Sequence, residues 1–186
     1  QVDGCMEKDG GPVIGIKIEN EYGHVGGLQG PEGEAHIRTL TAMAKEIGFD
    51  VPLYTATGWG GACIGDLLPV MGGYCEAPWD QRTCEIEPNA NFVFSHTRND
   101  ALIACDHHVE NANSYNEEDF PFLTAELGGG LQVTMHRRPV AKGCDVGAMS
   151  TVKMGSGAGL LGYYMYHGGS NPKGKLSTLQ ESRATG

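Results

Sequence analysis

The sequence lacks the features that would direct it to a membrane or to nucleic acid. It has no run of about 18 uncharged apolar residues, so we expect no membrane-spanning helix. It carries 13 basic residues against 23 acidic ones, a formal charge of −10, and no Lys/Arg cluster interleaved with aromatic residues. Because such a surface repels phosphate groups, no nucleic-acid partner is expected, whereas neutral polar ligands remain open.

Several short motifs are also missing. There is no Cys-x-x-Cys pair, Gly-x-Ser-x-Gly elbow, P-loop or Asn-x-Ser/Thr sequon. The Gly-x-Gly-x-x-Gly match at 157–162 precedes an apparent strand instead of opening a helix, and the polar run at 105–110 does not have zinc-ligand spacing. We therefore expect no cofactor and no metal, and we expect the six cysteines to be mostly buried thiols.

The beginning of the chain shows no signal peptide, because neither a basic segment nor an apolar segment is found there. The compartment therefore stays undecided, and a secreted or periplasmic location remains open. The oligomeric state is equally undecided.

Glycine, by contrast, is abundant: its 29 residues make up about 16% of the chain, against a usual ~7%. The glycines cluster where apolar runs end, as is typical of sharply turning loops. The runs predict five short buried strands, at residues 12–19, 51–56, 91–95, 120–125 and 160–166.

Apolar residues at helical spacing predict a helix over residues 34–47, between the first two strands, and a second helix should precede the last strand. Residues 62–89, with three prolines and three cysteines, are interpreted as a long surface loop. A strand–helix–strand order builds a parallel sheet, so the pattern indicates an α/β fold, either a TIM-type barrel or a doubly wound sheet.

Two glutamates stand at strand ends, where a charge is costly unless it reaches water, a partner or a substrate. Glu21 follows the first strand, and Glu126 closes the fourth. Alternation along a straight strand would place Glu19 and Glu21 on one face and Asn20 on the other. Two carboxylates on one sheet suit a retaining glycosidase, which holds them about 5–5.5 Å apart. Taken alone, the pattern also fits two solvated strand ends.

The segment 10–23 (GGPVIGIKIENEYG) resembles the signature of glycoside hydrolase family 35, the β-galactosidases built on (β/α)8 barrels. Residues 51–59 are similar to the fifth strand of that family, Thr124-Ala125-Glu126 to its nucleophile strand, the seventh, and residues 164–171 to its eighth. The similarities recur in order along the chain. The resemblance implies a (β/α)8 TIM barrel of the retaining glycosidase clan.

The resemblance also implies roles for individual residues. Glu21 would be the general acid/base and Glu126 the nucleophile of a double displacement that removes terminal β-galactose. Asn20 would bind the 2-hydroxyl of the sugar, and Glu19 would be a structural partner, for example of Arg or Lys. Trp59 and His167 are candidate substrate contacts. One departure is Gly128-Gly129-Gly130, where the family commonly has an aromatic-containing stretch.

The matched segments correspond to strands four to eight. We therefore expect residues 1–186 to form a partial catalytic barrel that is inactive alone, because an open barrel exposes its edges and interior. The alternatives are a non-catalytic or degenerate carbohydrate-binding relative, in which the glycine run replaces working parts, and a related retaining β-glycosidase with another sugar specificity.

Overall fold

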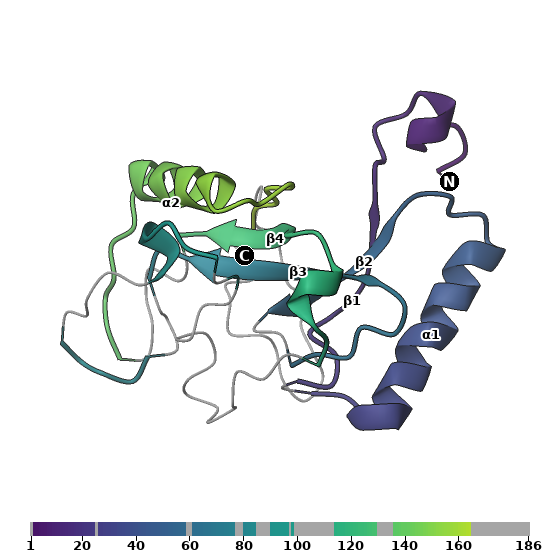
Figure 1. The fold of residues 1–186 in the computed structure, drawn as a ribbon, viewed down its shortest axis with the longest axis horizontal. Coiled ribbons are helices and arrows are strands. Elements are labelled where there is room, and N and C mark those ends of the chain that lie inside the picture. Colours follow the sequence, from purple (N-terminus) through teal and green to yellow (C-terminus); the bar gives the residue numbers. More distant parts are fainter. Residues whose placement is uncertain are drawn as a thin grey trace, which may run out of the picture.

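The computed structural model describes residues 2–24, 26–58, 61–76, 80–84, 90–96, 98, 114–129 and 136–164. Its centre is a sheet of four parallel strands in the order β1-β2-β3-β4. The strands are β1 (Ile16–Asn20), β2 (Leu53–Gly58), β3 (Leu68–Tyr74) and β4 (Thr124–Gly128). Helix α1 (Gly30–Glu46) lies beside the β1 side of the sheet, and α2 (Gly143–Gly155) lies by β4 (Figure 1). The predicted α/β fold with a parallel sheet is confirmed.

Helix α1 confirms the predicted helix, although it begins four residues earlier than expected. Pro31 stands in its first turn, where a missing N–H is tolerated, and Gly48 beyond its end has a φ of 93°. Its inner face buries Ile37 and Ala44 in a cluster with Leu53 of β2. Burying such side chains contributes about 1.5–3 kcal/mol each, which fixes the first crossover of the sheet.

The interpretation of residues 62–89 as a surface loop is wrong for its first part. Strand β3 lies within this segment, and the residues before it are buried, with Ala62 fully covered and Leu67 only 1% exposed. Cys63 and Leu67 pack into the cluster under α1. Glycine and proline suggested a loop, but Pro69 is accommodated near the start of the strand and the glycines within the strand sit where neighbours approach closely.

The predicted strand at 91–95 is also wrong. Residues Ala90–Phe92 form a short 3-10 helix, η2, and Val93 and Phe94 are 59% and 64% exposed. The position between β2 and β4 that this segment would have taken is occupied by β3. β-Propensity is overridden here because a strand needs a neighbour with free backbone groups. Two further 3-10 turns are η1 (Glu7–Asp9) and η4 (Glu117–Asp119).

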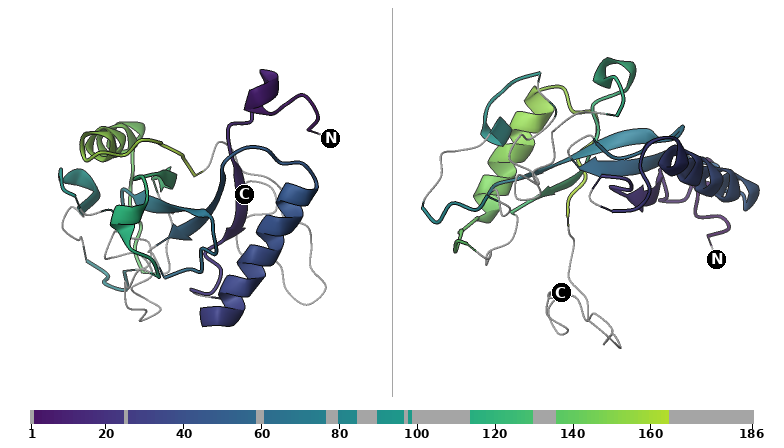
Figure 2. Two further views of the ribbon diagram at one scale, coloured as in Figure 1. Left: turned by 45° about the vertical axis from the view of Figure 1, so that its right-hand side comes forward. Right: turned by 90° about the horizontal axis from the view of Figure 1, so that it is seen from below.

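The last described segment runs along β4 on the side away from β3. Bridges join Leu123 to Leu160 and Leu127 to Tyr163, both parallel. The predicted final strand is therefore present in its first residues as strand-like pairing, and its remaining residues lie outside the described part of the chain. Helix α2 precedes it, as expected, and buries Met149 completely. Figure 2 shows α1 and α2 at the two ends of the sheet.

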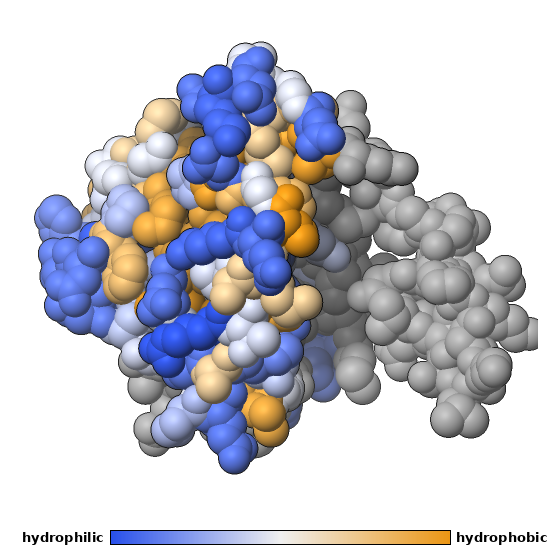
Figure 3. Space-filling view, turned by 90° about the vertical axis from the view of Figure 1, so that its right-hand side faces the viewer, coloured by the Kyte–Doolittle hydropathy of each residue, from blue (hydrophilic) through white to orange (hydrophobic). Residues whose placement is uncertain are grey.

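The surface on the α1 side mixes hydrophilic and hydrophobic residues (Figure 3). Met43 and Ile47 are exposed at this end of the molecule, and a few exposed apolar side chains are ordinary. Among the described helices, none has the length and apolarity needed to cross a membrane. The expectation that the cysteines are mostly buried is wrong for the described five, since Cys63 is buried while Cys84 and Cys144 are exposed.

Candidate functional site

The carboxyl ends of the parallel strands bring polar side chains to one edge of the sheet. Glu21 directly follows β1, Tyr74 is the last residue of β3, and Glu126 lies in β4. In open and closed α/β sheets alike, this edge is where ligands bind. The two predicted carboxylates are therefore brought to one site, although they are far apart in the sequence.

The chain bends sharply where β1 ends. Glu19 and Glu21 have positive φ values of 61° and 52°, which non-glycine residues rarely adopt. The register with β2 shifts between Lys17 and Asn20, so simple alternation does not hold at Glu19 to Glu21. Strained backbone of this kind is concentrated at functional sites.

Two contacts hold the bend. The N–H of Glu21 donates to the carbonyl oxygen of Ala56 on β2 at 2.8 Å. The carboxylate of Glu19 lies 3.3 Å from Nε2 of His36 on α1, and this ring stacks on Tyr22 at 4.3 Å between centroids. Glu19 therefore does have a side-chain partner, but that partner is a histidine and not the Arg or Lys that was suggested.

Both carboxylate oxygens of Glu126 have a partner. The hydroxyl of Tyr74 donates to Oε2 at 3.1 Å, and Nζ of Lys17 lies 3.5 Å from Oε1. Gly72 is the register partner of Glu126 on β3, and a Cβ there would lie 3.3 Å from the Cβ of Glu126. The glutamate thus stands over a glycine, between a tyrosine and a lysine from two other strands.

The two carboxylates differ in their surroundings. The pKa of Glu21 is raised to about 7, mainly by burial and secondly by the nearby charge of Glu126. The charge of Lys17 partly opposes this rise. Burial and the charge of Glu126 also raise the pKa of the Tyr74 phenol, so its hydroxyl remains a donor at neutral pH. Near neutral pH a large fraction of Glu21 carries a proton, while Glu126 accepts hydrogen bonds on both oxygens.

A pair of glutamates with these different environments, at the carboxyl edge of a parallel sheet, is the arrangement that glycoside hydrolases use. Comparison with protein families gives a match to the glycosyl hydrolases family 35 over residues 1–177. The chain belongs to glycoside hydrolase family 35. This is a TIM-barrel family of glycosidases, which act on O-glycosyl bonds of carbohydrates. No solved structure matches the chain.

The family assignment agrees with the parallel sheet, whose sequential strand order is that of part of a barrel. Of the predicted substrate contacts, Asn20 is the exposed last residue of β1, beside Glu21. Trp59 and His167 lie outside the described residues. The sequence reasoning missed Lys17 and Tyr74. The available signals were that Lys17 is a lone charge inside an apolar strand and that Tyr74 closes an apolar run.

The glycine run after Glu126 has a packing role at its first residue. Gly128 ends β4 and accepts a hydrogen bond from the N–H of Cys75, 3.0 Å away. A Cβ at Gly128 would lie 2.5 Å from the carbonyl oxygen of Tyr164. The absence of a side chain therefore lets the last described segment run close to β4.

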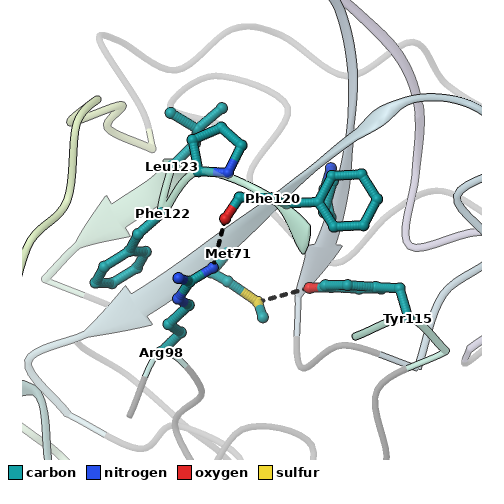
Figure 4. Close-up of a pocket in the computed structure, with 8 residues that line it drawn as sticks. Met71, Arg98, Tyr115, Phe120, Phe122 and Leu123 are labelled. Atoms are coloured by element: carbon teal, nitrogen blue, oxygen red, sulfur yellow. Dashed lines mark hydrogen bonds between the residues drawn. The ribbon is translucent and has the colours of Figure 1, made fainter. Parts of the chain in front are cut away.

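A hollow lies away from the carboxylates, at the amino ends of β3 and β4 (Figure 4). Phenylalanines, prolines and Met71 line much of it. Arg98 donates to the carbonyl oxygens of Glu117 and Phe120, and the hydroxyl of Tyr115 points to the sulfur of Met71 at 3.5 Å. The contact of Tyr115 with Met71 ties the segment around η4 to β3, and Arg98 binds two carbonyl oxygens of the same segment. We assign the hollow a packing role.

Metal-binding groups of three or more His, Cys, Asp or Glu side chains do not occur among the described residues. The polar run at 105–110 lies outside the described part of the chain.

Proposed function

We propose that Glu21 and Glu126 hydrolyse terminal β-galactosides with retention of configuration, Glu21 as acid/base and Glu126 as nucleophile. The observation that carries this proposal is the contrast between the two carboxyl groups. Burial and the neighbouring charge raise the pKa of Glu21 to about 7, as a general acid requires. Glu126 has a donor on each oxygen, as an ionised nucleophile requires.

In the first step, a carboxylate oxygen of Glu126 bonds to the anomeric carbon while the bond from that carbon to the aglycone oxygen breaks. Glu21 gives its proton to the departing oxygen, and a glycosyl ester of Glu126 remains. The negative charge thus leaves Glu126 and appears on Glu21.

In the second step, water replaces the aglycone. The oxygen of the water bonds to the anomeric carbon while Glu21, now a carboxylate, takes a proton from that water. The ester bond to Glu126 breaks at the same time. The sugar is released with its original configuration, and the charge returns to Glu126. Tyr74 donates to Glu126 and keeps its carboxylate oriented between turnovers.

The galactose specificity is proposed from the family resemblance. Asn20 stands beside Glu21, where a contact to the sugar 2-hydroxyl would strengthen in the transition state. Trp59 and His167 are kept as proposed substrate contacts, Trp59 as an aromatic platform for the sugar. A retaining β-glycosidase with another sugar specificity is the nearest alternative.

We further propose that residues 1–186 supply strands four to eight of the barrel. In this assignment β1, β2, β3 and β4 are strands four to seven, and the segment at 160–164, bridged to β4, begins the eighth. The first three strands and the closing contacts would then come from outside these residues, and activity would require the full-length gene product.

The proposal is tested by following hydrolysis of 4-nitrophenyl β-galactoside by the full-length gene product with proton NMR. The β-anomer of galactose should appear first, and Glu126→Gln should abolish turnover. First appearance of the α-anomer, or full activity in the variant, would refute the assignment. A panel of other β-glycosides, assayed alongside, separates the reaction type from the sugar specificity.

A non-catalytic relative that only binds carbohydrate is the second candidate, and the glycine run after Glu126 was the reason to consider it. The close packing of Tyr164 on Gly128 supports a structural reason for the first glycine instead. Binding of β-galactosides without turnover would favour this second candidate.

A further inference from the structure

Lys17 is a cation on β1, the strand that leads to Glu21, and it contacts Glu126. Its Nζ lies 3.5 Å from Oε1 of Glu126, 109 residues away in the sequence. The side chain of Glu126 is only 14% exposed and that of Lys17 is 35% exposed, so water screens the pair incompletely. Lys17 also lowers the pKa of Glu21, and therefore acts electrostatically on both carboxyl groups.

The charges in this cluster balance when one of the two carboxyl groups is ionised and the other is neutral. Lys17 contributes one positive charge, so a partly buried site tolerates one negative charge well and two poorly. With Glu126 ionised, the second carboxyl group retains its proton, and that group is Glu21. Among the described residues, the other groups that face the cluster are phenols: Tyr54 is the register partner of Lys17 on β2, Tyr74 comes from β3, and Tyr164 lies near Tyr74.

The same balance holds through both steps of the proposed reaction, on which this inference rests. Before glycosylation the negative charge is on Glu126, and in the glycosyl ester it is on Glu21. We infer that Lys17 is the fixed counter-ion of a single negative charge that passes from Glu126 to Glu21 and back, and so acts as a positioning residue for both. A merely structural lysine would orient Glu126 without affecting the proton on Glu21.

The experiment compares the wild type with Lys17→Met and Lys17→Arg in the full-length gene product, using the pH dependence of kcat/KM and of kcat. In Lys17→Met the basic limb of kcat/KM should move to higher pH by about one pH unit, because the cation that favours ionised Glu21 is lost. At neutral pH kcat should fall about 10- to 100-fold, since the carboxylate formed in each step lacks its counter-ion. Lys17→Arg keeps the charge and should restore the wild-type limb.

Lys8→Met is the matched control, because Lys8 forms an exposed ion pair with Asp50 at 2.9 Å and has no contact with the site residues. Its pH profile should equal that of the wild type. An unchanged limb in Lys17→Met, with rates lowered equally at every pH, would overturn the inference and leave the proposed function standing.

If the wild type hydrolyses none of the glycosides tested, the proposed function fails and the inference is decided without turnover. The carboxyl resonance of Glu21, labelled with carbon-13 and assigned with Glu21→Gln, is then titrated. A higher midpoint in Lys17→Met than in the wild type supports the inference, and equal midpoints overturn it.

Discussion

The hydroxyl group of Tyr74, at the end of β3, donates a 3.1 Å hydrogen bond to Oε2 of Glu126 on the neighbouring strand β4. Tyr74→Phe removes this donor and keeps the ring. A hydrogen bond to a charged group is worth about 1.5–3 kcal/mol, so we expect kcat/KM to fall about 10- to 100-fold. Steady-state kinetics on 4-nitrophenyl β-galactoside measure the change.

Tyr115→Phe is the control for this prediction. The hydroxyl of Tyr115 contacts Thr57 and Met71, away from the carboxylates, and its loss should leave kcat/KM within about twofold of the wild type. Equal losses in the two variants would show that the Tyr74 hydroxyl matters only for folding.

Glu21→Gln removes the proposed acid and leaves the proposed nucleophile, Glu126, in place. Substrates whose aglycone leaves readily need little protonation, so the variant should retain much of its glycosylation rate on dinitrophenyl galactosides. On alkyl or disaccharide substrates the loss should be about 100-fold or more, the usual contribution of a general acid. The plot of rate against the pKa of the leaving group measures this difference, and parallel losses on all substrates would contradict the role of Glu21.

The raised pKa of Glu21 also predicts how stability changes with pH. The folded state binds the Glu21 proton more tightly than the unfolded state does. The contribution of this proton to the free energy of unfolding is therefore complete below pH 4.5 and is lost as pH rises to about 7. Glutamine cannot ionise. Glu21→Gln should therefore gain stability relative to the wild type between pH 4.5 and 8, by about 1–3 kcal/mol.

Urea unfolding at pH 4.5 and pH 8 measures this difference. Glu118→Gln, at an exposed position in η4, is the control and should show the same stability difference from the wild type at both values. Equal behaviour of Glu21→Gln and Glu118→Gln would contradict a buried, protonated Glu21 carboxyl group.

Gly128→Ala should destabilise the fold, because the added Cβ would lie 2.5 Å from the carbonyl oxygen of Tyr164. Overpacking of this kind costs about 1–3 kcal/mol. Gly147→Ala is the matched control: it lies inside α2 with open space around the new Cβ, and should stabilise by about 0.5–1 kcal/mol. Thermal melts of both variants test the pair, and a neutral Gly128→Ala would contradict the packing role.

The helix α1 and strands β1 and β2 could be predicted from the sequence because apolar periodicity and glycine stops are local signals. Strand β4 was predicted only in part, since it begins four residues later than the predicted strand at 120–125. Strand β3 was missed because its glycines and proline are read locally as loop residues, whereas the strand forms by pairing on both sides. The segment at 91–95 was predicted as a strand for the converse reason: its residues favour strands, but Ala90–Phe92 forms a 3-10 helix and β3 takes the place beside β2.

Only part of the candidate site could be predicted from the sequence. Glu21 and Glu126 stood out as charges at strand ends and matched a family motif. Lys17 and Tyr74 were not found, because their importance comes from contacts to Glu126 across 109 and 52 residues of sequence. The bend at Glu19 and Glu21 was likewise hidden, since positive φ values at glutamate have no signature in composition.

The most direct test of the central claim is to trap the glycosyl ester in the full-length gene product. A 2-deoxy-2-fluoro-β-galactosyl fluoride slows the second step more than the first, so the ester accumulates. Peptide mapping by mass spectrometry should find one fluorogalactosyl group, on Glu126, and none in Glu126→Gln. A label on another residue, or inactivation without a covalent label, would contradict the assignment of Glu126 as the nucleophile.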